Sequence, residues 1–169
     1  MVTQPVVFIH IPKCAGNSIR LGLKNAGVYY VNIGHSTHDS SSCYKFTFVR
    51  NPYDRIVSHY TMFPRPDISF IQYVRWYVKR YPHARHMTTY VFDQATSQRK
   101  VDFVGRYENI QEDFDKLCDQ VGVPCVKLPH VNKSLSREHQ NYKKYYDEQT
   151  FNLVTEIFSS DLKRFNYTF

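Results

Sequence analysis

The stretch from Val6 to Ser18, which reads VVFIHIPKCAGNS, constrains the fold more than any other part of the chain. Its first half is an apolar run broken by one histidine, with the length and β-branched content of a buried parallel strand. Pro12 and Gly16 then mark a turn. The apolar spacing beyond the turn is helical, with Asn17 or Ser18 available as the helix cap. The sequence therefore predicts a strand, a short loop and a helix.

A loop in this position presents backbone N–H groups and the positive end of a helix dipole to one anion. Lys13 adds an ammonium group to the same loop, and Ser18 adds a hydroxyl. The sequence therefore predicts a phosphate-binding loop, although ordinary packing of a strand against a helix is the simpler alternative. Its candidate binding residues are Lys13, Ala15, Gly16, Asn17 and Ser18.

The order of residues in this loop argues against a nucleoside triphosphatase, whose loop reads GxxxxGK[ST]. Here Lys13 precedes Gly16 by three positions, and Asn17 stands where that lysine would be. The form PKxxGxS instead resembles the loop that holds the 5′-phosphosulfate in sulfotransferases. Members of that family use 3′-phosphoadenosine 5′-phosphosulfate as donor, so the resemblance implies this donor and its product, adenosine 3′,5′-bisphosphate.

A second motif follows the strand predicted at Lys45–Arg50 and reads VRNPYDRIVSHY. Pro52 ends the strand, and Asp54 is a candidate cap for the next helix. Arg50 and Ser58 are eight positions apart, so a guanidinium and a hydroxyl can close on one phosphate at a helix N-terminus. This motif is similar to the sulfotransferase pattern RNPxxRxxSxY, which implies that Arg50 and Ser58 bind the 3′-phosphate of the donor.

The polar stretch between these motifs contains Gly34-His35 and His38. A loop after a parallel strand faces the ligand crevice of an open α/β sheet. In the branch of the family that sulfates glycans, a Gly-His pair between the two motifs supplies the catalytic base. The resemblance therefore implies His35 as the base, with His38 in reserve; two surface histidines are the alternative.

Two weaker similarities lie further along the chain. A strand predicted at Val101–Tyr107 is followed by a helix at Ile110–Val121, and Asn109 with Glu112 fits a capping box for that helix. In several relatives an aromatic residue at the position of Tyr107 lies against the adenine, and core packing is the alternative.

The polar segment from Pro124 to Tyr146 resembles the closing segment of the family. That segment lies over the nucleotide in relatives, which makes Lys133 a candidate contact with the donor. Asp147 is then a candidate cap for the last long helix, Glu148–Ser159.

The chain has 169 residues, with 12 Phe and 14 Tyr, enough for one domain with a substantial core. We predict a single α/β domain over residues 1–169. It would have a central, mainly parallel sheet, the phosphate loop after the first strand and helices on both faces, a three-layer fold like that of P-loop proteins.

The net charge of +7 favours anionic ligands, and no recognised nucleic-acid module is present. The sequence shows no apolar run long enough to cross a bilayer and no signal peptide, so we expect a minimal, soluble, cytoplasmic form of bacterial or viral origin, or a shortened one. The four cysteines lack metal-ligand spacing, and no metal is expected.

The resemblance implies a transferase that moves a sulfuryl group to an acceptor hydroxyl. A saccharide is our first choice of acceptor, because of the Gly34-His35 pair and the net positive charge of the chain. Lys13 would neutralise charge on the leaving oxygen, and His35 would take the acceptor proton. A small-molecule or nucleotide kinase and a non-catalytic polyanion-binding module are the two alternatives. The sequence leaves the oligomeric state open.

Overall fold

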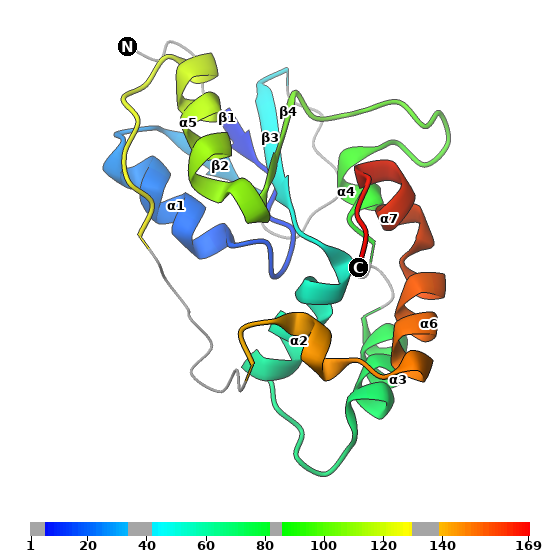
Figure 1. The fold of residues 1–169 in the computed structure, drawn as a ribbon. Coiled ribbons are helices and arrows are strands. Elements are labelled where there is room, and N and C mark those ends of the chain that lie inside the picture. Colours follow the sequence, from blue (N-terminus) through cyan, green and yellow to red (C-terminus); the bar gives the residue numbers. More distant parts are fainter. Residues whose placement is uncertain (1–5, 34–41, 82–85, 130–138) are drawn as a thin grey trace. The chain divides into compact units, whose positions relative to one another are not determined.

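The computed structural model describes residues 6–33, 42–81, 86–129 and 139–169. Within these ranges the chain forms four strands, seven α-helices and two short 3₁₀ helices, shown in Figure 1. In chain order they are β1 (Val6–Phe8), α1 (Gly16–Asn25), β2 (Tyr30–Asn32), β3 (Tyr44–Val49), α2 (Pro52–Met62), α3 (Phe70–Arg80), α4 (Thr88–Val91), β4 (Phe103–Arg106), η1 (Tyr107–Asn109), α5 (Ile110–Val121), η2 (Tyr142–Tyr145), α6 (Glu148–Ile157) and α7 (Ser159–Phe165).

The four strands form one sheet in the order β2-β1-β3-β4, and every pair is parallel. Val7 is paired with Val31 on one side and with Lys45 on the other, and Phe46 is paired with Phe103. Parallel strands need crossover connections; α1 lies between β1 and β2 in the chain, and α2, α3 and α4 lie between β3 and β4. The predicted α/β fold with a mainly parallel sheet is confirmed.

The chain divides into two compact units. The first unit comprises residues 1–49 and 89–132, and therefore holds the whole sheet with α1 and α5. The second unit comprises residues 50–88 and 133–169 and holds α2, α3, α6 and α7. Our expectation of one domain over residues 1–169 stays a prediction.

The core of the first unit follows from the two-residue period of its strands. Val6 and Phe8 of β1 and Phe46 and Phe48 of β3 point to the same face and are buried. Helices α1 and α5 cover that face (Figure 1). The buried helical residues in this cluster are Ile19, Leu23, Phe114, Leu117 and Cys118. Helices on the second face stay a prediction.

The second unit has an aromatic core between α2, α3 and α6. Tyr53, Tyr73 and Tyr77 are almost completely buried there, together with Val154 and Phe158. Several of the ring pairs meet edge to face or tilted, and Tyr53 and Phe151 are stacked; both geometries are ones that aromatic quadrupoles favour. The abundance of tyrosine in the sequence therefore serves mainly to build this helical unit.

The starts of α6 and α5 confirm one cap prediction and overturn another. Asp147 caps α6 as predicted, since its Oδ1 accepts the backbone N–H of Thr150 at 2.7 Å. Within the described residues, however, the Asn109 side chain makes no cap hydrogen bond to α5, so the capping box with Glu112 is wrong. A 3₁₀ turn, η1, leads directly into α5 and satisfies this helix start by continuing the backbone instead.

Candidate functional site

The loop between β1 and α1 has an unusual backbone. Lys13 has φ 69° and Ala15 has φ 60°, so both lie in the left-handed region. This conformation costs a residue with a side chain about 1 to 2 kcal/mol. Among the described residues, two of the four non-glycine positions with positive φ are in this one loop. Cys14 between them keeps a negative φ. Such alternation of left-handed and other backbone conformations is typical of loops that bind anions through their N–H groups.

The loop is also closely packed. The N–H of Cys14 donates to Ile11 O at 3.3 Å, and the N–H of Ile19 donates to Ala15 O at 3.2 Å. A Cβ on Gly16 would lie 2.0 Å from Nε2 of His10, whose ring stacks on Phe8. Gly16 is therefore required because the backbone at the start of α1 passes directly against an imidazole.

The predicted cap of α1 is wrong. The N-cap is Ala15, whose methyl side chain cannot accept a hydrogen bond, and the helix begins at Gly16. Asn17 and Ser18 are instead within the first turn, where backbone N–H groups have no acceptor inside the helix. The Asn17 side chain is exposed, whereas Ser18 is buried. The helix starts earlier than predicted because the left-handed residue at 15 turns the chain into it.

The second motif is in the second unit, where Arg50 directly precedes the cap of α2. Its side chain is 6% exposed, and Asp54 Oδ2 accepts from Nε at 2.8 Å and from Nη2 at 2.6 Å. The Arg50 backbone N–H donates to Met87 Sδ at 3.5 Å. Both the backbone and the side chain of Arg50 are thus held, and sequence reasoning missed both partners. The spacing of Arg50 and Asp54, four residues, was the available signal.

Asp54 is not the helix cap that we predicted. The cap of α2 is Asn51, whose Oδ1 accepts the N–H of Tyr53 at 3.0 Å, and whose Nδ2 donates to Thr168 O at 2.8 Å. The first-turn position leaves the Asp54 carboxylate available to Arg50. Ser58 is one further turn along α2 and partly exposed.

A half-buried phenol, that of Tyr146, lies near the Asp54 end of the Arg50–Asp54 pair. Tyr146 donates its O–H to Tyr53 O at 2.8 Å. Burial, with Tyr53 and Asp54 nearby, raises the pKa of Tyr146 well above the usual value for tyrosine. The phenol therefore stays protonated and adds no second negative charge beside Arg50.

Tyr107 is at the carboxyl end of β4, in η1, and is partly buried in the first unit. The strand end is fixed to α5, since Asp113 Oδ2 accepts the N–H of Arg106 at 2.8 Å. The position of Tyr107 at a strand end agrees with the sequence-based prediction, and its role in stacking on the adenine stays a prediction. His35, His38 and Lys133 lie outside the described residues.

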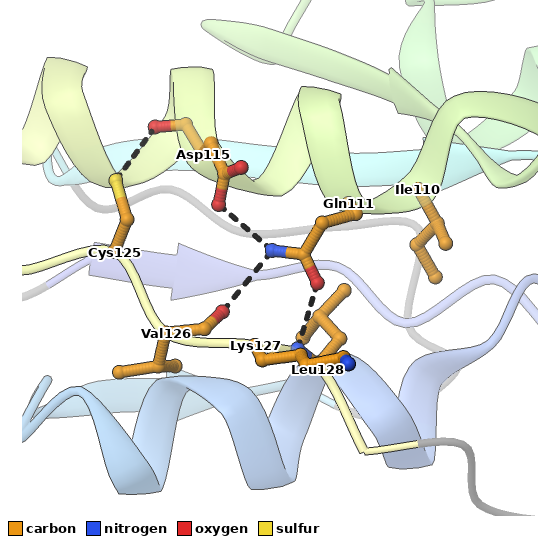
Figure 2. Close-up of a pocket in the computed structure, with 7 residues that line it drawn as sticks. All are labelled: Ile110, Gln111, Asp115, Cys125, Val126, Lys127 and Leu128. Atoms are coloured by element: carbon orange, nitrogen blue, oxygen red, sulfur yellow. Dashed lines mark hydrogen bonds between the residues drawn. The ribbon is translucent and has the colours of Figure 1, made fainter.

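A pocket of about 560 Å³ opens on the surface of the first unit, between α5 and the segment that follows it. Figure 2 shows Gln111 at its centre, with Nε2 donating to Asp115 Oδ1 and Val126 O, and Oε1 accepting from the N–H of Leu128. Its lining residues differ from the predicted site residues, being Ile110, Gln111, Asp115, Cys125, Val126, Lys127 and Leu128. These hydrogen bonds hold residues 125–128 against α5. We therefore interpret the pocket as a packing gap between the two and not as a ligand site.

The described residues contain neither a candidate metal-ion cluster nor a candidate membrane span. In those ranges, no three His, Cys, Asp or Glu residues gather as they would around a metal ion. None of the helices described there combines the length and the apolar character needed to span a membrane.

Lys13 belongs to the first unit and Arg50 to the second, so their joint action on one ligand stays a prediction.

Comparison with known proteins gives two matches. Residues 29–168 match the sulfotransferase family, a range that includes Arg50, Ser58 and Tyr107 and begins after the β1–α1 loop. An uncharacterized protein of Archaeoglobus fulgidus is 35% identical over 101 residues, which are 59% of this chain and 82% of that protein. The family match covers most of the chain and agrees with the parallel α/β sheet described above. The chain therefore belongs to the sulfotransferase family.

Proposed function

We propose that this sulfotransferase moves a sulfuryl group from 3′-phosphoadenosine 5′-phosphosulfate to a hydroxyl on a saccharide. The backbone of the β1–α1 loop is the observation that supports this donor most directly. Left-handed conformations at Lys13 and Ala15 are energetically unfavourable, and such strain is retained where neighbouring structure requires it, often at ligand sites. Concave N–H groups followed by a helix N-terminus suit a phosphate or sulfate.

Each end of the donor has its own residues in this proposal. Residues 13 and 15–18 hold the 5′-phosphosulfate, through backbone N–H groups and the Ser18 hydroxyl. Arg50 and Ser58 bind the 3′-phosphate. Arg50 suits that role because a guanidinium gives paired, charge-assisted hydrogen bonds to a phosphate, and its side chain is already ordered by Asp54. Tyr107 stacks on the adenine, and Lys133 contacts the donor.

The proposed reaction is an in-line displacement. The acceptor oxygen forms a bond to sulfur while the bond between sulfur and the bridging oxygen of the donor breaks. Lys13 stabilises the negative charge that develops on that oxygen, and His35 takes the proton of the acceptor hydroxyl, with His38 as the alternative base. The leaving group is adenosine 3′,5′-bisphosphate. Such a mechanism relies on positioning and charge stabilisation, as phosphoryl transfer does.

A saccharide acceptor is supported by the Gly34-His35 pair, which resembles the glycan-sulfating branch, and by the charge of +7. Positive charge raises the local concentration of anionic acceptors such as uronate-containing or sulfated glycans. Radiolabelled donor offered to saccharides, tyrosine peptides and small alcohols tests this choice. Labelling of the peptides or alcohols alone would contradict the saccharide assignment without affecting the donor.

Calorimetry tests the donor directly. Adenosine 3′,5′-bisphosphate and ATP with magnesium are titrated separately into the protein. Preference for the bisphosphate supports the proposal, preference for magnesium-ATP supports a kinase, and failure to bind either supports a polyanion-binding module. Arg50→Ala should weaken bisphosphate binding about tenfold or more, because a charge-assisted contact is lost. Arg75→Ala, an exposed arginine of α3, is the matched control and should leave the affinity unchanged.

A further inference from the structure

Arg50 and Asp54 form a buried ion pair across the start of α2. Arg50 directly precedes the Asn51 cap, and Asp54 is in the first helical turn. One carboxylate oxygen, Oδ2, accepts from both Nε at 2.8 Å and Nη2 at 2.6 Å. The side chains are 6% and 13% exposed, so water screens the pair weakly.

This contact restrains the guanidinium in more than one way. Two donors on one edge of the planar group converge on a single acceptor, which fixes the plane and the last torsions of the arginine. The backbone at Arg50 is restrained as well, because Met87 Sδ accepts its N–H at 3.5 Å. The rotational freedom that a long cationic side chain normally loses on binding a ligand is therefore lost largely before the ligand arrives.

The Asp54 carboxylate also makes burial of the arginine possible. An isolated buried guanidinium would be strongly unfavourable, and a carboxylate one turn away compensates its charge. Both hydrogen bonds to Asp54 come from the Nε edge of the guanidinium.

We infer that Asp54 is a positioning residue for recognition of the 3′-phosphate: it orients Arg50 and so sets the preference for nucleotides that carry this phosphate over those that lack it. The inference rests on the proposed function, which assigns Arg50 to that phosphate. Asp54 acts through Arg50 and has no direct contact with the nucleotide in this account.

The test compares two ligands that differ only in the 3′-phosphate. Calorimetry gives the dissociation constants of adenosine 3′,5′-bisphosphate and adenosine 5′-monophosphate. The constant for the monophosphate divided by that for the bisphosphate measures recognition of the 3′-phosphate. Asp54→Asn, which removes the charge and keeps the size, should lower the ratio about tenfold. In an Arg50→Ala background the same substitution should change nothing further, because no guanidinium remains to be oriented.

Two additional variants complete the test. Asp67→Asn changes the carboxylate that faces Arg65 at 4.0 Å in an exposed ion pair of the same unit, and it should leave the ratio unchanged. If Asp54→Asn fails to fold by thermal unfolding, Asp54→Glu takes its place. Its carboxylate is one methylene further out, so the ratio should fall less.

The outcomes separate the inference from the proposed function. A wild-type protein that binds both nucleotides equally would contradict the proposed function itself. A wild-type preference that survives unchanged in whichever Asp54 variant folds would overturn the inference alone. Equal weakening of both nucleotides would also overturn it, because that result indicates a structural ion pair without a role in selecting the 3′-phosphate.

Discussion

Asp161 accepts a hydrogen bond from the backbone N–H of Met87 at 2.9 Å, although the two residues are 74 positions apart. Its second oxygen accepts the N–H of Thr88, also at 2.9 Å. Met87 in turn accepts the backbone N–H of Arg50 through its sulfur. A fully buried carboxylate at the start of α7 therefore fixes the segment that packs against the second motif.

Asp161→Ala should lower the free energy of unfolding by about 2 to 4 kcal/mol, because two buried N–H groups lose their acceptor. Urea unfolding followed by tyrosine fluorescence measures the change. The neighbouring exposed variant Ser160→Ala is the control and should differ little from wild type. Equal stability of the Asp161 variant and wild type would mean that the two hydrogen bonds contribute nothing net.

Gly105→Ala should destabilise the sheet by about 1 to 3 kcal/mol through overpacking. A Cβ at this position of β4 would lie 2.3 Å from Cε1 of Phe48, which is fully buried on β3. Thermal unfolding measures the loss. Adding Phe48→Leu in the double variant should cost less than the sum of the single changes, and strict additivity would argue against the close contact.

Asp147 should contribute to the loss of stability in acid. Hydrogen bonds from the backbone and side chain of Thr150 lower its pKa below the ordinary aspartate value of 3.8. The unfolded chain therefore binds more protons than the folded one near this pH, so the contribution is present above 3.8 and is lost as pH falls through the lowered value.

Asp147→Ser keeps a side-chain oxygen at the cap and removes the titration. Urea unfolding between neutral and acidic pH should show a flatter acid limb for this variant, with stability near neutral pH largely retained. An acid limb as steep as that of wild type would show that other carboxylates account for the whole effect.

Lys13→Ala should reduce turnover about a hundredfold or more while the fold is retained, since charge developing on the leaving oxygen loses its cation. Lys24→Ala, an exposed lysine at the end of α1, is the matched control. Single-turnover assays with radiolabelled donor give the rate, and circular dichroism checks the fold. Near-normal turnover would remove Lys13 from the mechanism.

His35→Ala should also reduce turnover strongly, and the wild-type rate should fall as pH drops below about 6.5, where a histidine base becomes protonated. The pH profile of the variant should lose this limb. His38→Ala decides between the two histidines: if it alone abolishes turnover, the base is His38.

The sequence by itself determined the parallel α/β fold and the order of the motifs. The apolar run at Val6, the proline after Asn51 and the apolar helix faces are local patterns, because periodicity and φ restriction act over a few residues. The family match over residues 29–168 agrees with this part of the prediction. The strand-to-helix loop was also predictable in position.

The tertiary structure decided how the candidate residues are held. The Cβ of a residue at 16 would meet His10, the Asp54 carboxylate pairs with Arg50, and Asp161 reaches Met87 across the chain. Cap residues were predicted wrongly at the starts of α1 and α2, and the capping box was predicted wrongly at α5, for the same reason. Several polar side chains near a helix start can each serve as its cap, and which one does so depends on backbone conformation and distant partners that local sequence does not encode.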